Sequence, residues 1–117
     1  MSSRLLAVAI DSRDATALAD FWAKVLGRDG AFSWDDGTGR TYVEVPGEPA
    51  LLFQRVPERK AGKNRLHLDL VPAAGTQEAE TARLTGFGSR VIDPAPDFPW
   101  VVLIDPEGNE FCVLPPR

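Results

Sequence analysis

The same order of secondary-structure signals occurs twice along the 117 residues, and this repeat limits the possible folds more than any other feature. In each half a short apolar segment leads into a helical pattern, and three further strand-like segments follow. The charged segment 57–63, which has almost no large apolar residues, separates the halves. Because a lone unit of this kind leaves one sheet face uncovered, we expect both halves to form one domain, 1–117.

The first half predicts a helix with clear boundaries. Apolar residues recur at helical spacing from Ala15 to Leu26, and Trp22 falls on the apolar face, so we expect it in the core. Asp14 supplies N-cap chemistry, and Gly27 stands where a left-handed C-cap is expected. Strands are expected at 5–10, 31–34, 40–45 and 50–56.

The second half predicts a mostly polar helix over 76–85 and strands at 65–71, 89–92, 100–104 and 110–114. The expected fold class is therefore α+β. Two tandem βαβββ modules, 1–57 and 64–117, would form a curved, barrel-like mixed sheet around a central cleft, with the helices outside.

Composition excludes several classes of function. A formal net charge of −4 provides no basic stripe for nucleic acid. The apolar run at the start is too short for a signal peptide or a membrane span, and the single cysteine cannot form an internal disulfide. No glycine-rich phosphate loop has the required spacing, so no nucleotide cofactor is indicated. We expect a cytoplasmic protein without nucleic-acid or membrane partners.

Three stretches carry a resemblance to a known family. They are the helix start at Asp14 with Phe21-Trp22 and Leu26-Gly27, the segment 64–70 (NRLHLDL) and the segment 105–111 (DPEGNEF). Their order and spacing resemble the vicinal oxygen chelate superfamily, which includes glyoxalases, bleomycin-resistance proteins and extradiol dioxygenases. The resemblance implies a single glyoxalase-like domain, a small-molecule ligand in the cleft and a homodimer.

The resemblance also implies where metal ligands would stand, one on each of four strands. The first position falls on Ala7, which has no donor atom, and the second on Leu52 or, after a small register slip, on the weak ligand Gln54. His67 matches the third position, and Cys112 stands at the fourth. A catalytic zinc normally takes three protein ligands, so we expect no metal site and no cofactor, with a divalent metal as the minority alternative.

His67 and Asp69 are the predicted catalytic pair. Strand side chains alternate, so Arg65, His67 and Asp69 should share the cleft face, while Leu66, Leu68 and Leu70 lie under the helices. The carboxylate can orient the ring of the sole histidine for acid–base chemistry or anion binding. The structural alternative is an ion pair that fills the interior without catalysing anything.

Four further residues are ligand-binding candidates beside Arg65. Trp34 and Trp100 flank turns, where an aromatic side chain can line a pocket or simply pack. Cys112 lies in an apolar strand and is expected to be buried and inert, unless it faces His67. Glu110 should share the face of Cys112 and could replace the missing carboxylate ligand if the strand slipped by two residues, but we expect a charged strand end exposed to water.

These observations favour a small-molecule-binding protein that resembles the bleomycin-resistance proteins and lacks the usual metal site. Whether it is an enzyme stays open at this stage. One alternative is a metal-dependent lyase, isomerase or dioxygenase. The other is a metal-free acid–base enzyme that uses His67 and Asp69.

Overall fold

The computed structural model describes residues 1–93 and 99–117, and its contacts divide the chain into a first unit, Met1–Arg59, and a second unit, Lys60–Arg117. Each unit contains one helix and one four-stranded mixed sheet, in the order strand, helix and three strands. The predicted α+β class with two βαβββ modules is therefore confirmed. No helix of the described ranges is both long and apolar enough to cross a membrane.

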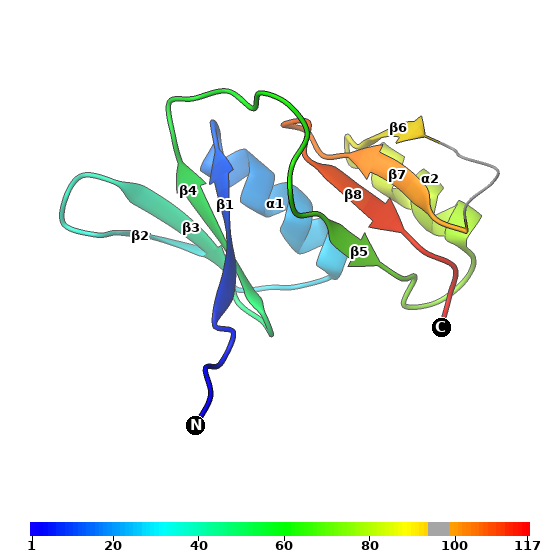
Figure 1. Cartoon of the computed structure of the whole chain (residues 1–117), viewed down its shortest axis with the longest axis horizontal. Helices are drawn as coiled ribbons and strands as arrows, with labels where there is room; N and C mark the ends of the chain where they lie inside the picture. The colour runs from blue at the N-terminus through cyan, green and yellow to red at the C-terminus, as the bar shows by residue number, and fades with distance from the viewer. Residues whose placement is uncertain (94–98) are drawn as a thin grey trace. The chain divides into compact units, whose positions relative to one another are not determined.

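In the first unit the outer strand pair is parallel and the other pairs are antiparallel. The sheet order is β1-β4-β3-β2, and α1 lies along one face of this sheet (Figure 1). The elements are β1 (Ala7–Ser12), α1 (Ala15–Leu26), β2 (Phe32–Asp35), β3 (Thr41–Val45) and β4 (Ala50–Arg55).

The boundaries of α1 agree with the predicted helix because both of its caps form. The Asp14 carboxylate accepts a hydrogen bond from the N–H of Ala17 at 3.0 Å. Gly27 adopts φ 62°, in the left-handed region that a C-cap glycine favours. Trp22 is buried, as predicted.

The core of the first unit lies between α1 and one face of the sheet. Alternate residues of the two central strands face the helix, as expected from the two-residue repeat of a strand. The buried side chains are Leu18, Phe21, Trp22 and Val25 of the helix with Val43, Val45, Leu51 and Phe53 of the sheet. The residues between them in these strands project from the opposite face of the sheet, which we call the first open face.

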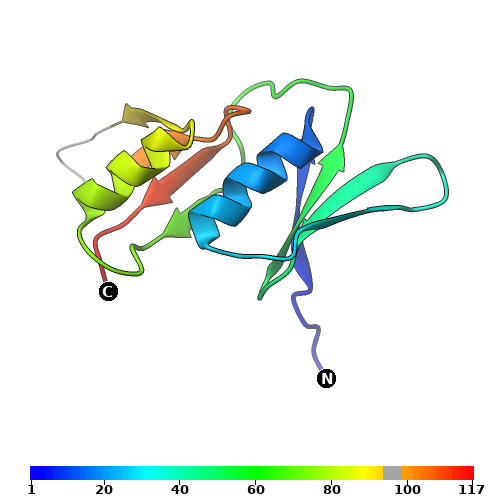
Figure 2. The same ribbon diagram turned by 180° about the vertical axis from the view of Figure 1, so that it is seen from behind.

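The second unit repeats this topology with sheet order β5-β8-β7-β6, in which β5 and β8 are parallel. Figure 2 shows α2, coloured yellow-green, lying along this sheet. The elements are β5 (Leu68–Leu70), α2 (Gln77–Gly86), β6 (Arg90–Asp93), β7 (Val101–Ile104) and β8 (Glu110–Val113). Leu84 of α2 is fully buried, as are Leu103, Phe111 and Val113 of the sheet.

Two strand predictions in these units need correction. β5 begins at Leu68 rather than at residue 65, and Leu66 is 84% exposed instead of lying under a helix. The ladder with β8 starts only at the pair Leu68 and Phe111, so the preceding residues are not held in a sheet. β1 likewise begins at Ala7, because its partner β4 begins at Ala50, and Leu5 is exposed.

Candidate functional site

The face of the second sheet opposite α2, the second open face, brings together His67, Asp69 and Cys112. Asp69 is the Cα partner of Cys112 in the parallel pair of β5 and β8, so the two side chains project from the same face. One imidazole nitrogen, one carboxylate oxygen and the sulfur all lie within 4.8 Å of one another. Three reactive groups therefore meet although up to 45 positions separate them in the sequence.

The imidazole and the carboxylate form the accessible part of this cluster. Nε2 of His67 lies 3.3 Å from Oδ1 of Asp69, and the two side chains are 44% and 55% exposed. The carboxylate can hold the ring in one orientation while solvent, or a ligand, reaches both groups. This geometry suits hydrogen bonding to a ligand and also proton transfer.

The thiol of Cys112 forms the buried part of the cluster, since the residue is 7% exposed. Burial raises the pKa of this thiol above its ordinary value, as do the negative charge of Asp69 and the hydrogen bond to it, while Lys63 acts in the opposite direction. The thiol is therefore protonated at neutral pH and is a poor nucleophile on its own. The sequence predicted the burial but left the proximity to His67 open.

Glu110, another predicted ligand-binding residue, anchors the segment that leads into β5. Its carboxylate accepts hydrogen bonds from Nζ of Lys60 at 2.7 Å and from the N–H of Asn64 at 3.0 Å. Burial works against ionisation, but these hydrogen bonds outweigh it and lower the pKa of Glu110. The expectation of a water-exposed strand end is therefore wrong, because the side chain of Glu110 is 14% exposed and paired with Lys60.

The remaining predicted residues, Arg65, Trp100 and Trp34, are not members of this cluster of three donors. Arg65 is exposed, just before β5. Trp100 is 36% exposed, just before β7. Trp34 belongs to β2 of the first unit, where its ring stacks on that of Tyr42 with the centroids 4.3 Å apart.

The first open face is richer in aromatic and apolar side chains. The register places Trp34 beside Tyr42 on neighbouring strands, and the hydroxyl of Tyr42 donates a hydrogen bond to Asp36 at 2.9 Å. Hydrogen bonds from Thr38, together with that of Tyr42, lower the pKa of Asp36 to about 2. The stack is thus tied to the adjacent turn.

The positions at which the superfamily's first two metal ligands were expected also lie on the first open face. Ala7 and Leu52 offer no donor atom there, and Gln54 offers only a neutral amide. Among the described residues, the single group of three possible metal donors is His67, Asp69 and Cys112. The residues present therefore do not fit the superfamily's metal set.

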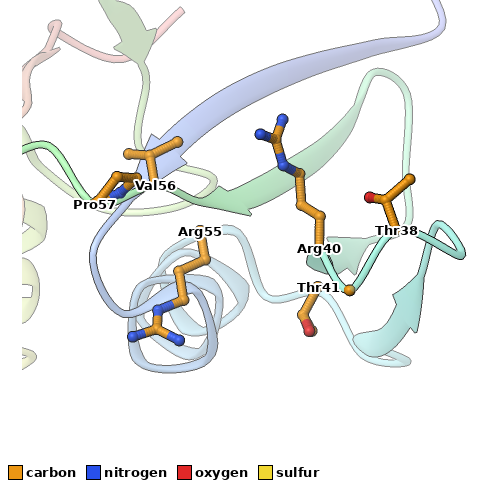
Figure 3. Close-up of a pocket in the computed structure, with 7 residues that line it drawn as sticks. Thr38, Arg40, Thr41, Arg55, Val56 and Pro57 are labelled. Carbon is orange, nitrogen blue, oxygen red and sulfur yellow. The ribbon is translucent and has the colours of Figure 1, made fainter.

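A shallow hollow of about 420 Å³ in the first unit was missed by the sequence reasoning. Its lining is Thr38, Gly39, Arg40, Thr41, Arg55, Val56 and Pro57. Figure 3 shows the side chains of Arg40 and Arg55 pointing in opposite directions. The two guanidinium groups consequently do not converge on one anion, and this hollow is the weaker candidate site.

The chain is similar to known proteins in sequence and in fold. A family model described as a glyoxalase-like domain matches residues 7–114. The fosfomycin resistance protein FosX from Mesorhizobium loti is 13% identical with a TM-score of 0.77, covering 97% of this chain and 92% of that one. The trypanothione-dependent glyoxalase I of Leishmania major is 15% identical with a TM-score of 0.71, covering 97% and 86%.

A glyoxalase/bleomycin resistance protein/dioxygenase family enzyme from Burkholderia phytofirmans PsJN is 19% identical with a TM-score of 0.70, covering 95% of this chain and 97% of that one. No curated protein matches the sequence at a significant level. At these identities the solved structures support the fold, and the chemistry must come from the residues described above.

Proposed function

Because the chain belongs to the glyoxalase-like domain family of the vicinal oxygen chelate superfamily, we propose that it binds a small organic molecule on the second open face. The observation that carries this proposal is the cluster of His67, Asp69 and Cys112, whose polar atoms lie within 4.8 Å of one another. The superfamily's metal set takes no part in holding this molecule, since Ala7 and Leu52 supply no donor.

The chemistry of the second open face indicates which ligands suit it. Asp69 accepts hydrogen bonds, and the imidazole of His67 can donate or accept one. Val102 and Ile104 are the partners of Cys112 and Glu110 on the neighbouring strand, so they supply half-buried apolar area on the same face. The ligand class is a molecule with an apolar body and a hydrogen-bond donor, such as an amine or hydroxyl, at one end.

The binding test uses metal-free, full-length protein and a panel of aromatic amines, phenols and carboxylates, followed by ¹H–¹⁵N NMR. We expect an aromatic amine or phenol to shift the amide signals of His67, Asp69 and Cys112. The variants His67→Ala and Asp69→Asn should weaken binding by at least about tenfold, equal to about 1.4 kcal/mol. They should keep the fold, because both side chains are half exposed.

The matched control is Asp20→Asn, which changes an exposed carboxylate that pairs with Lys24 on α1. It should leave binding unchanged. Binding that survives both His67→Ala and Asp69→Asn would contradict the proposed site, and shifts confined to residues 38–57 would move the ligand to the arginine-lined hollow.

A second candidate function, acid–base catalysis without a metal, is favoured by the 3.3 Å contact between His67 and Asp69. A bound ligand with an acidic C–H bond should then exchange that hydrogen with D₂O faster than it does free in solution. The exchange should be lost in His67→Gln, which keeps a polar side chain but no titratable nitrogen. Binding without any enhanced exchange would leave the protein as a binder only.

A further inference from the structure

We infer that His67, Asp69 and Cys112 together form a site for one thiophilic divalent cation of the zinc class. An imidazole nitrogen, a carboxylate oxygen and a thiolate sulfur are the three donor types that zinc takes from proteins, and three protein donors leave one position open. All three residues belong to the second unit, and no residue of the first unit is needed. The inference goes beyond small-molecule binding and is tested separately from it.

The separations between the donor atoms suit a tetrahedral ion after a small movement. Zinc–ligand bonds of about 2.0–2.3 Å place neighbouring tetrahedral ligands roughly 3.2–3.8 Å apart. The distance of 3.3 Å between Nε2 of His67 and Oδ1 of Asp69 already falls in this range. The other separations are at most 4.8 Å, so they must close by about an ångström.

The side chains of His67 and Asp69 can make this movement. His67 and Asp69 are exposed and can rotate, whereas Cys112 is buried on β8 between its partners Asp69 and Val102. The sulfur thus provides the fixed donor, and the accessible pair closes on the ion from the solvent side. The open fourth position faces solvent, where water or a donor atom of a bound molecule can occupy it.

The charges also balance when the cation binds. Coordination displaces the proton of the Cys112 thiol into the solvent, which leaves a thiolate and a carboxylate around a 2+ ion. The ion then takes the place of the hydrogen bond from the thiol to Asp69. Lys63 is the nearby cation whose charge opposes the ion, and substituting it should strengthen binding.

The repeat supplies an internal negative control for this site. In the first sheet, Ala9 and Leu52 are Cα partners in the parallel outer pair, as Asp69 and Cys112 are in the second, and Ala7 precedes Ala9 as His67 precedes Asp69. None of these three residues of the first unit has a metal donor in its side chain. The expected stoichiometry is therefore one ion per chain and not two.

The experiment titrates full-length, chelator-treated protein with ZnCl₂ in a calorimeter and with CoCl₂ in an absorption spectrometer. We expect one equivalent of zinc, and a sulfur-to-cobalt charge-transfer band that disappears in Cys112→Ala. His67→Gln and Asp69→Asn should each weaken zinc binding by at least about tenfold, equal to about 1.4 kcal/mol. Since these two side chains are exposed, the two variants test the site even if Cys112→Ala fails to fold.

Glu78→Gln is the matched control, because it changes an exposed carboxylate of the same unit on α2, the helix that lies along the other face of the second sheet. It should bind zinc as the unaltered protein does. The site is overturned if zinc binds more weakly than about millimolar, if cobalt binds without the sulfur band, or if His67→Gln and Asp69→Asn bind zinc unchanged. Because the small-molecule test uses metal-free protein, either proposal can fail while the other stands.

Discussion

The two open faces are built on the same topology but carry different chemistry. Equivalent positions of the parallel outer pairs hold Ala9 and Leu52 in the first sheet and Asp69 and Cys112 in the second. The first open face carries the stacked rings of Trp34 and Tyr42, and the second carries the imidazole, carboxylate and thiol of the metal-donor cluster. Strand order and register thus provide positions, and the side chains at a few of those positions decide what each face can bind.

The faces that pack on the helices show the opposite behaviour. Phe53 and Phe111 lie on the helix side of the central strands β4 and β8, and both are fully buried. The sheet face that packs on the helix is apolar in both units because it must exclude water. The opposite face does not have this constraint, and its side chains differ between the units. Substitutions at matched positions of the two units test this contrast between a repeated core and divergent open faces.

The largest effect is expected from truncating the two core phenylalanines. Phe53→Ala and Phe111→Ala should each lower the free energy of unfolding by about 3–5 kcal/mol, since each leaves a cavity in a closely packed core. Urea denaturation followed by circular dichroism measures both. The comparison predicts similar losses in the two units, and a loss below about 1 kcal/mol in either would show that its helix-side face is not a core.

A smaller but still clear effect is expected at the turn before β8. Asp105 is 3% exposed, and its Oδ1 accepts hydrogen bonds from the backbone N–H groups of Glu107 at 2.9 Å and Asn109 at 3.0 Å. Asp105→Ala leaves these donors without their acceptor and should cost about 1–3 kcal/mol in urea denaturation. Asp105→Asn keeps an oxygen acceptor and should cost less.

The first unit offers the matched control for this turn. Asp36 also accepts a hydrogen bond from a backbone N–H two residues later, that of Thr38 at 2.9 Å, but it lies on an exposed turn. Asp36→Ala should therefore destabilise the protein less than Asp105→Ala, because water can replace the lost acceptor. Equal losses would mean that burial does not distinguish the two turns.

Removing the aromatic stack should have a modest effect. Trp34→Ala should lower stability by about 1 kcal/mol, because the stacked pair contributes little beyond the area it covers and Trp34 is 38% exposed. Thermal or urea unfolding measures the loss. Tyr42→Phe retains the ring and removes only the hydrogen bond to Asp36, so it should cost less. A loss as large as that of Phe53→Ala would place Trp34 in the core.

The smallest effect is local and depends on pH. The pKa of Glu110 is lowered in the folded protein, so its contribution is complete above its ordinary pKa near 4.5 and is lost as the pH falls through the folded pKa. As the pH falls below 4.5 and through this lowered pKa, the amide of Asn64 should lose hydrogen-exchange protection, after correction for the intrinsic exchange rate.

Val56 is the control in the first unit, since its N–H donates to the backbone carbonyl of Ser12 at 2.8 Å and no carboxylate takes part. Its protection should not change over the same pH range. Glu110→Gln should remove the pH response of Asn64, and a response that persists in this variant would assign it to another group.

Local signals in the sequence were sufficient for the elements that local chemistry controls. The helix 15–26 was predicted with correct bounds because Asp14 and Gly27 cap it within the same short segment. The burial of Trp22 followed from helical periodicity. The repeat of the element order was enough to predict two βαβββ modules, because it required no knowledge of long-range contacts.

Contacts between distant residues account for what the sequence did not predict. β5 begins late because its ladder with β8 starts only at Leu68, and the preceding segment is held instead by a hydrogen bond from the N–H of Asn64 to the carboxylate of Glu110, 46 positions away. The proximity of Cys112 to His67 depends on the register of β5 with β8, which alternation alone does not determine. The repeat contained a usable signal, since pairing the first and last strands of each half in parallel would have placed these residues together.

Because Cys112 is buried, the reaction of its thiol with a labelling reagent can report local opening of the second sheet. The chain contains a single cysteine, so every alkylation or disulfide-exchange event reports on one known atom. Burial and a raised pKa both slow the reaction of this thiol, and it should be modified mainly when β8 separates from its neighbours. The rate of labelling therefore measures, without any engineered tag, how often the second sheet opens.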